Sequence, residues 1–229
     1  MPTLLAVGAH YDDAVFGVGG LLLRAVRKNY RTVILSLIGD YSNWKPVSGR
    51  EQELVKRTAE LAKARGVETR FLDFAGSRFE VTAETKRAVS RAVAEVQPDV
   101  ALMLWQDDRH SDHVVASALS KVALQHGDRL LEAGAAYRPA KAVYWYDNGP
   151  GHTIGFEPDT YVDVTDVWAE ANDWLGELMA VVRNQPYDRT KPDGAQNAKE
   201  SLARYRGAAC GVRYAEALRA FRPRAQDIL

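Results

Sequence analysis

The stretch Val100-Ala-Leu-Met-Leu-Trp105 is almost entirely apolar and lies between the polar pairs Pro98-Asp99 and Gln106-Asp107. A short apolar run with no alternation of polar residues is typical of a strand that is covered on both faces of a parallel sheet. We therefore expect this stretch to be a strand at the centre of an open sheet.

Strand-like and helix-like segments alternate along the chain. Further strands are expected at Thr3–Gly8, Thr32–Ile38, Arg70–Phe74, Ala142–Tyr146 and Thr160–Val164. Helices are expected at Val15–Tyr30, Gly49–Gly66, Thr82–Gln97, Asp112–His126, Trp168–Arg183, Ala198–Ala209 and Val212–Phe221. The polar stretch Gln185–Asn197, with two prolines, is expected to be a mobile loop. This rhythm predicts one α/β domain over residues 1–229, a Rossmann-like three-layer α/β/α fold with a mostly parallel sheet.

Composition narrows the classes of partner. The 229 residues contain 30 Lys+Arg and 30 Asp+Glu, so the formal net charge is zero and gives no reason to expect a nucleic acid or an anionic membrane as partner. The single cysteine, Cys210, excludes an intrachain disulfide and suits a reducing cytoplasm; we expect it to be a buried core thiol. The expected partner is a small-molecule substrate, with self-association left open.

Two polar clusters follow strands directly. They are Ala9–Asp13, after the first strand, and Asp107–His113, after the central strand. Ligands in open α/β sheets bind beyond the carboxyl ends of the strands, so neighbouring strands would bring the two clusters together. His10, Asp13 and His113 could then offer two imidazoles and one carboxylate to a metal ion. Such a set leaves positions open for water and substrate, as in catalytic zinc sites, although other divalent metals accept it as well.

The same residues also allow interpretations without a functional site. A cluster of Asp and His could be a solvated turn before a helix cap, but two such clusters after two predicted strands favour a site. The glycines of Gly17-Val-Gly19-Gly20 resemble a dinucleotide fingerprint only weakly, and we expect them to let a helix pack closely on the sheet. His126 and His152 are interpreted as ordinary surface histidines.

At these clusters the chain resembles the PIG-L/LmbE-like zinc-dependent N-deacetylases. Ala9-His10-Tyr11-Asp12-Asp13 is similar to their Ala-His-Pro-Asp-Asp motif, and Asp108–His113 is similar to their His-x-Asp-His motif. The resemblance extends to Gly19-Gly20, Arg50-x-x-Glu53, Ala64–Val67, Tyr161–Thr165, Asn184-Gln185 and Arg206–Glu216. It covers nearly the whole chain and implies a Rossmann-like fold.

The resemblance implies roles for individual residues. His10, Asp13 and His113 correspond to the zinc ligands of the family. Asp12 corresponds to the general base that activates water, and His110 corresponds to the residue that stabilises the oxyanion and can protonate the leaving amine. These roles suit amide hydrolysis, because an amide needs a polarised carbonyl, an activated water and a proton for the departing amine.

Asp112 is expected to orient an imidazole, and Arg50 corresponds to a substrate-contacting arginine. The chain departs from the family pattern at several places. Tyr11 replaces the motif proline and adds an aromatic ring beside the metal, where we expect it to shape the substrate pocket. Ala14 replaces the usual glutamate, and Ala75-Gly76-Ser77 stands where the family often has Pro-Asp-Gly.

Three hypotheses follow from these observations. The first is a zinc-dependent hydrolase that cleaves an N-acyl bond, N-acetyl in the simplest case, of a small-molecule amine or amino-sugar-like compound. The second is a metal-binding relative with a changed reaction or without deacetylase activity. The third, a nucleotide-dependent Rossmann enzyme, rests only on the weak glycine pattern.

Overall fold

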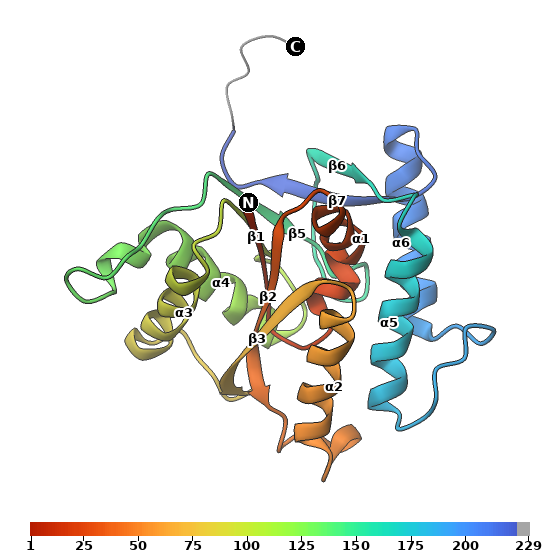
Figure 1. Cartoon of the computed structure of the whole chain (residues 1–229), viewed down its shortest axis with the longest axis horizontal. Helices are drawn as coiled ribbons and strands as arrows, with labels where there is room; N and C mark the ends of the chain where they lie inside the picture. Colours follow the sequence, from red (N-terminus) through yellow and green to blue (C-terminus); the bar gives the residue numbers. More distant parts are fainter. Residues whose placement is uncertain (224–229) are drawn as a thin grey trace.

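The computed structural model describes residues 1–223, and its centre is a seven-stranded sheet in the order β3-β2-β1-β4-β5-β7-β6 (Figure 1). The strands are β1 Thr3–Gly8, β2 Arg31–Asp40, β3 Val67–Ala75, β4 Val100–Leu104, β5 Ala142–Tyr146, β6 Thr160–Asp163 and β7 Ala215–Ala220. The strands from β3 to β5 are parallel to one another, whereas β7 runs antiparallel to both β5 and β6. The predicted Rossmann-like, mostly parallel sheet is therefore confirmed.

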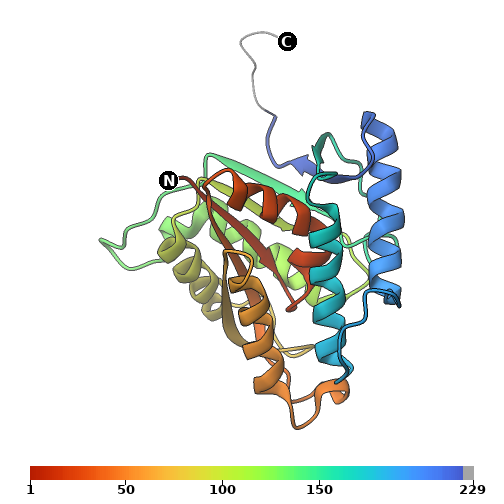
Figure 2. The ribbon, with the colours of Figure 1, turned by 45° about the vertical axis from the view of Figure 1, so that its right-hand side comes forward.

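Helices cover both faces of this sheet. They are α1 Asp13–Arg27, α2 Glu51–Lys63, α3 Ala83–Val96, α4 Ser111–His126, α5 Trp168–Val182 and α6 Gly194–Cys210, with short 3-10 helices at Lys45–Val47 and Gly127–Arg129. Helices α3 and α4 pack together on one face, and α1, α2 and α5 pack on the other (Figure 1). Figure 2 shows α6 standing beside α5, and α6 also packs near β7.

The apolar strands position the two polar clusters. Strand β1 is buried over its whole length and lies between β2 and β4, with Val7 opposite Met103 in register. The carboxyl ends of β1 and β4 therefore lie side by side, so the loops that follow them meet at one edge of the sheet.

The predicted helix Val212–Phe221 is wrong, because the chain forms strand β7 there. Alanine and leucine in this stretch suggested a helix, but Gly211 ends α6 in the left-handed conformation, with φ 77°. The following residues then pair with both β5 and β6, for example Tyr144 with Ala220. Pairing on two sides outweighs the local helix propensity.

Two smaller expectations also need correction. The predicted loop Gln185–Asn197 is too long at its end, because α6 already begins at Gly194, where Asp193 and Gln196 form a capping box. Cys210 is exposed at the end of α6, so the predicted buried thiol is wrong.

Helix α1 carries a kink that is held from the C-terminal part of the chain. Val18 has non-helical backbone angles, φ −140° and ψ 23°. The Glu216 carboxylate accepts hydrogen bonds from the backbone N–H groups of Gly20 at 2.8 Å and Leu21 at 2.7 Å. The Lys199 ammonium donates to the carbonyl of Val15 at 3.1 Å and to Glu216 at 2.8 Å. This buried ion pair thus takes up backbone groups that the kink removes from the helix ladder.

The glycines of α1 serve packing, as expected. A Cβ atom on Gly17 would lie 2.3 Å from the Tyr146 ring of β5, and one on Gly20 would lie 2.7 Å from Val164. The helix can approach the sheet this closely only without side chains at these positions.

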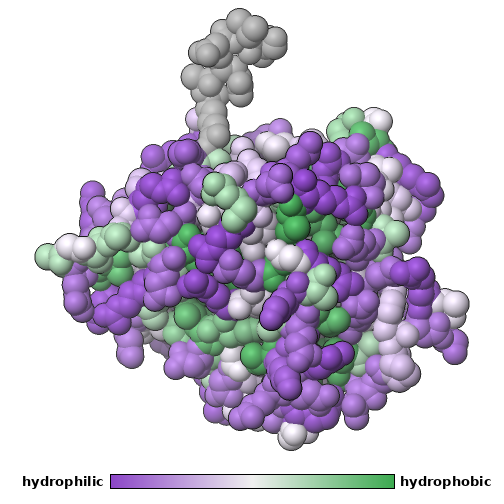
Figure 3. All heavy atoms as spheres, viewed as in Figure 1, coloured by the Kyte–Doolittle hydropathy of each residue, from purple (hydrophilic) through white to green (hydrophobic). Residues whose placement is uncertain are grey.

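The surface facing the viewer in Figure 3 is mostly hydrophilic, with apolar residues in small separate patches. Among the described residues, no helix combines the length and apolar character that a membrane crossing requires.

Candidate metal centre

His10, Asp13 and His113 converge at the carboxyl ends of β1 and β4. The Nδ1 atom of His10 lies 3.2 Å from Nε2 of His113, and the Asp13 carboxylate lies 3.1 Å from that Nε2 atom and 3.5 Å from Nδ1 of His10. Two ring nitrogens and a carboxylate that face one another within 4.8 Å form a donor set that suits a divalent cation. The three residues predicted as ligands are therefore brought together.

The backbone and a neighbouring loop hold Asp13 in place. Its Oδ2 atom accepts hydrogen bonds from the backbone N–H groups of Ala9 at 2.8 Å and His10 at 2.7 Å. Its Oδ1 atom accepts from the Asn148 side-chain amide at 2.7 Å. Burial opposes ionisation of Asp13, but the nearby His113 and His10 keep its pKa well below the usual range. The carboxylate is thus charged and fixed.

Carboxylates also stand behind both imidazoles. Asp108 Oδ2 lies 3.1 Å from Nδ1 of His113, and Asp112 Oδ2 lies 3.2 Å from Nε2 of His10. Burial lowers the pKa of both histidines, but the surrounding carboxylates, Asp13 first, raise it to about 9 for His113 and about 10 for His10. An environment that favours positive charge so strongly on these rings fits the binding of a cation. The predicted role of Asp112 in orienting an imidazole agrees with its contact with His10.

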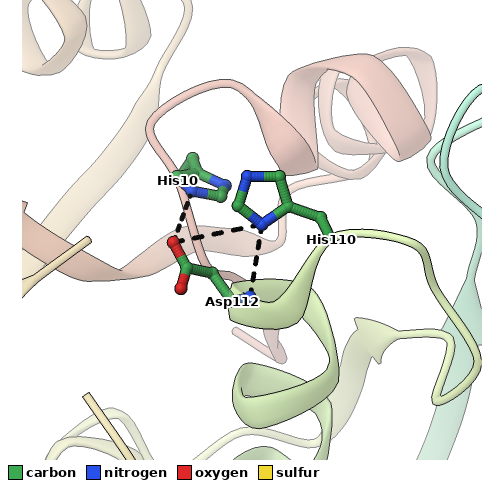
Figure 4. Close-up of side chains that lie close together, drawn as sticks. All are labelled: His10, His110 and Asp112. Carbon is green, nitrogen blue, oxygen red and sulfur yellow. Dashed lines mark hydrogen bonds and ion pairs between the residues drawn. The ribbon is translucent and has the colours of Figure 1, made fainter. Parts of the chain in front are cut away.

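His110 lies at the start of α4, where it caps the helix. Its Nδ1 atom accepts a hydrogen bond from the backbone N–H of Asp112 at 3.2 Å, so its proton resides on Nε2 when the ring is neutral (Figure 4). The ring stacks on His113 with centroids 4.8 Å apart. Burial and the neighbouring His10 and His113 lower the pKa of His110. His110 can therefore act as a neutral hydrogen-bond donor through its Nε2–H group.

Asp12 is the residue before α1 and lines the same cavity as the three ligand candidates. Burial and the charge of Asp13 raise the pKa of Asp12 to about 6. A carboxylate with a pKa near neutrality is suited to accept a proton from water.

A cavity of about 540 Å³ opens over these residues. All predicted site residues of the two clusters line it: His10, Tyr11, Asp12, Asp13, His110, Asp112 and His113. Arg50 is not among the lining residues. Its guanidinium donates to the backbone carbonyls of Val181 at 3.1 Å and Val182 at 2.9 Å, which belong to the last turn of α5. The structure thus places Arg50 on a helix end and shows no contact with the cavity.

Three functional candidates escaped the sequence analysis. Asp108 belongs to the second cluster but received no role there. Asn148 and His152 come from the loop after β5, the strand next to β4, and both line the cavity. His152 is exposed as expected, yet its ring centroid lies 5.2 Å from that of His113. Their position beyond the carboxyl end of a third parallel strand was the signal that could have identified them.

Comparison with known proteins agrees with the fold. The chain is 24% identical over 184 residues to the 4-oxalmesaconate hydratase of Pseudomonas putida KT2440, which covers 72% of this chain and 68% of the relative. Among solved structures, the 4-carboxy-2-hydroxymuconate hydratase of Pseudomonas putida KT2440 matches with a TM-score of 0.81 and 21% identity, covering all of both chains. The N,N'-diacetylchitobiose deacetylase of Pyrococcus horikoshii matches with a TM-score of 0.75 and 19% identity, covering 96% of this chain and 83% of the other.

The family comparison is more specific. The model described as "PIG-L: GlcNAc-PI de-N-acetylase" matches residues 5–124, more than half of the chain. This segment includes both polar clusters and the whole candidate ligand set of His10, Asp13 and His113. The family is metal-dependent, in agreement with the donor atoms that meet here. The chain therefore belongs to the PIG-L family.

Proposed function

We propose that this protein is a metal-dependent hydrolase that cleaves the N-acyl bond, N-acetyl in the simplest case, of a small-molecule amine. The observation that carries the proposal is the convergence of His10, Asp13 and His113 beside a group able to move a proton, Asp12, and a hydrogen-bond donor, His110. The family match and the deacetylase among the structural neighbours support the same reaction class.

We propose zinc as the metal, with other divalent ions as alternatives. His10, Asp13 and His113 would hold it, and the loop Asn148–His152 would border it. A cation of this kind supplies a Lewis acid that lowers the pKa of water and polarises a carbonyl.

Asp12 serves as the general base in this proposal. Its carboxylate accepts a proton from the water whose oxygen attacks the carbonyl carbon of the amide. The raised pKa of about 6 lets Asp12 keep that proton briefly and still return to its charged form near neutral pH.

His110 serves as the donor. The Nε2–H group is the one available to a substrate, because Nδ1 accepts a hydrogen bond from the Asp112 backbone N–H in the first turn of α4. It donates a hydrogen bond to the oxygen on which negative charge develops. The proton that Asp12 took from water passes to the nitrogen as the C–N bond breaks, which returns Asp12 to its charged form. The products are a carboxylate and a free amine.

Substitution of Asp12 tests this assignment. We expect Asp12→Asn to keep the metal and to lose most of the turnover, because the amide cannot take a proton from water. Metal analysis of the purified protein, followed by an acetate-release screen over N-acetylated amines, measures both quantities. Removal of the metal by a chelator should abolish release, and added zinc should restore it. Full activity of Asp12→Asn would remove Asp12 from the mechanism.

A second candidate is a hydratase or another changed reaction on the same metal site. The identity to a 4-oxalmesaconate hydratase over 72% of the chain favours it, as does Tyr11 in place of the motif proline. Metal binding without release of an acyl group from any amide, together with hydration of an unsaturated acid, would establish this alternative.

The remaining proposals concern the surroundings of the enzyme. We propose a small molecule as its partner and no nucleic acid or membrane, on the basis of the balanced charge. The single free cysteine suits a cytoplasmic location. Self-association is proposed only by analogy with the family.

A further inference from the structure

Three aromatic rings form one wall of the cavity beside the ligand candidates. We call Tyr11, Tyr41 and Trp44 the aromatic wall; their centroids lie 5.9, 6.0 and 6.0 Å from one another. The Tyr11 backbone N–H donates to the Tyr41 hydroxyl at 3.0 Å, and the Trp44 backbone N–H donates to the Tyr41 carbonyl at 2.9 Å. Tyr11 and Tyr41 are buried, and Trp44 is half-buried. The wall is thus fixed by packing and hydrogen bonds before any ligand arrives.

The charges around the cavity disfavour an anionic ligand. Among the residues that the structure describes, no lysine or arginine lines the cavity; apart from tyrosine, its ionisable side chains are the carboxylates of Asp12, Asp13 and Asp112 and four imidazoles at the candidate metal centre. A carboxylate or phosphate on the part of the substrate that lies away from this centre would find no arginine or lysine to pair with, and an unpaired charge is costly to desolvate.

Several polar groups of the lining are already engaged within the protein. The Asn43 amide donates to the Gly76 carbonyl at 2.6 Å, and the Asn148 amide donates to Asp13. Both oxygens of Asp112 accept from the Ser77 backbone N–H at 3.0 Å. These contacts occupy part of the polar lining, while the Asn148 side-chain oxygen has no hydrogen-bond partner within the described part of the chain.

The cavity volume exceeds what a simple acetamide needs. About 540 Å³ lies within the range of sites that enclose drug-sized ligands, roughly 300–1,000 Å³. The cavity therefore has room for a bulky substituent, and the aromatic wall is one part of its apolar lining, beside Phe16, Pro150, Ala195 and Ala198.

We propose that the substrate is an uncharged amide that carries an aromatic ring, and that this ring packs against the aromatic wall. The inference rests on the proposed hydrolase function and adds the class of substrate. Ring-on-ring contact and the burial of apolar surface stabilise the bound ring. The ring can belong to either side of the amide, because the wall adjoins the site without showing which side faces it.

A matched set of amides tests the proposal. N-benzylacetamide carries the ring on the amine, N-methylbenzamide carries it on the acyl group, and N-ethylacetamide has none. N-acetylglucosamine replaces the ring with hydroxyl groups, and 4-(acetamidomethyl)benzoate adds a charge. We expect kcat/KM for the better of the two ring amides to exceed that for N-ethylacetamide by about tenfold or more. The values of kcat/KM for N-acetylglucosamine and for 4-(acetamidomethyl)benzoate should be at least about tenfold below that of the better ring amide.

Variants identify the wall as the cause. Trp44→Leu should reduce the ratio of kcat/KM between N-benzylacetamide and N-ethylacetamide several-fold. Trp105→Leu is the matched control, because Trp105 packs against Trp145 and Phe156 outside the cavity lining; it should leave the ratio unchanged.

Binding without turnover separates the two proposals. Ligand-observed NMR of N-benzylacetamide with Asp12→Asn should show binding that Trp44→Leu weakens. If this binding is seen but no amide is hydrolysed, the aromatic subsite stands and the hydrolase proposal fails. Equal kcat/KM values for the ring amides and N-ethylacetamide would overturn the aromatic subsite. Faster hydrolysis of N-acetylglucosamine or of 4-(acetamidomethyl)benzoate than of the ring amides would overturn it as well. Absence of both binding and turnover overturns both.

Discussion

The Asp108 carboxylate lies 3.1 Å from Nδ1 of His113, on the side of the ring opposite to the Nε2 atom that faces His10 and Asp13. The Asp108 side chain is almost fully buried, and the backbone N–H of His110 donates to its other oxygen at 2.8 Å. A carboxylate behind a ligating imidazole fixes the ring and makes it a better donor. Asp108 therefore belongs to the candidate metal centre, although it would support a ligand rather than bind the metal itself.

We expect Asp108→Asn to weaken metal affinity by about 10- to 100-fold, because the amide holds the His113 ring less firmly and without charge. Competition with a zinc-binding dye measures the affinity directly. Asp107→Asn is the matched control, since Asp107 is exposed and adjacent. Equal affinities for Asp108→Asn and the wild-type protein would show that Asp108 does not support the ligand.

The pH profile of the reaction tests the role of Asp12. Asp12 accepts a proton only when it is ionised, and its raised pKa of about 6 means that the ionised form is lost as the pH falls through this value. We expect kcat/KM to rise with pH along an acid limb whose midpoint is near 6.

Variants of Asp12 check the assignment of that limb. Asp12→Glu should keep an acid limb, because a carboxylate remains, while Asp12→Asn should lose it together with most of the rate. Residual activity of Asp12→Asn with the same limb as the wild type would assign the titration to another group.

Much of the fold and of the candidate metal site could be predicted, because the local sequence patterns agree with the rule that ligands bind beyond the carboxyl ends of parallel strands. The apolar runs of β1 and β4 were visible in the sequence, and polar residues directly after both strands indicated where a site would form. The ligand candidates His10, Asp13 and His113 lie within a few residues of these strand ends. Their meeting followed from the pairing of β1 with β4 alone.

The features that escaped prediction depend on distant contacts. Strand β7 contains alanines that favour a helix, and only its pairing with β5 and β6 decides otherwise. Glu216 is buried because Lys199 neutralises it and the α1 backbone donates to it, and these α1 contacts join residues far apart in the sequence. Asn148 and His152 reach the cavity because β5 pairs with β4, which the sequence alone did not establish.

The buried pair Lys199–Glu216 makes a prediction about stability. Removal of one partner leaves the other charge buried without compensation, so we expect Lys199→Met and Glu216→Leu each to lower the free energy of unfolding by about 3–5 kcal/mol. The double variant should lose less than the sum of the single variants. Urea unfolding measures all three values.

The matched control for this pair is Arg204→Ala, which breaks the Arg204–Glu200 pair on the same helix. The Arg204 side chain is exposed and that of Glu200 is partly exposed, and ion pairs that solvent reaches contribute about 0–1 kcal/mol. Losses that simply add in the double variant of Lys199 and Glu216 would show that the two charges do not depend on each other.

Asp99 makes a prediction about stability against acid. Its carboxylate accepts hydrogen bonds from the Arg138 guanidinium at 2.8 Å and from the backbone N–H of Thr3 at 2.9 Å, and it lies 3.2 Å from the Lys141 ammonium. These contacts connect the start of β1 to the segment before β5. These partners, Arg138 first, hold the pKa of Asp99 well below its usual value.

The sign of the pH effect follows from this shift. Because the folded state binds the proton of Asp99 more weakly than the unfolded state, the stabilisation is present above the unfolded pKa of about 4 and is lost as the pH falls below it. Asp99→Asn should therefore lower Tm at pH 7, and the difference from the wild type should shrink between about pH 4 and pH 2. Thermal unfolding across this range, with the exposed Asp73→Asn as control, measures it; a difference in Tm that stays constant down to pH 2 would mean that the charge of Asp99 does not stabilise the fold.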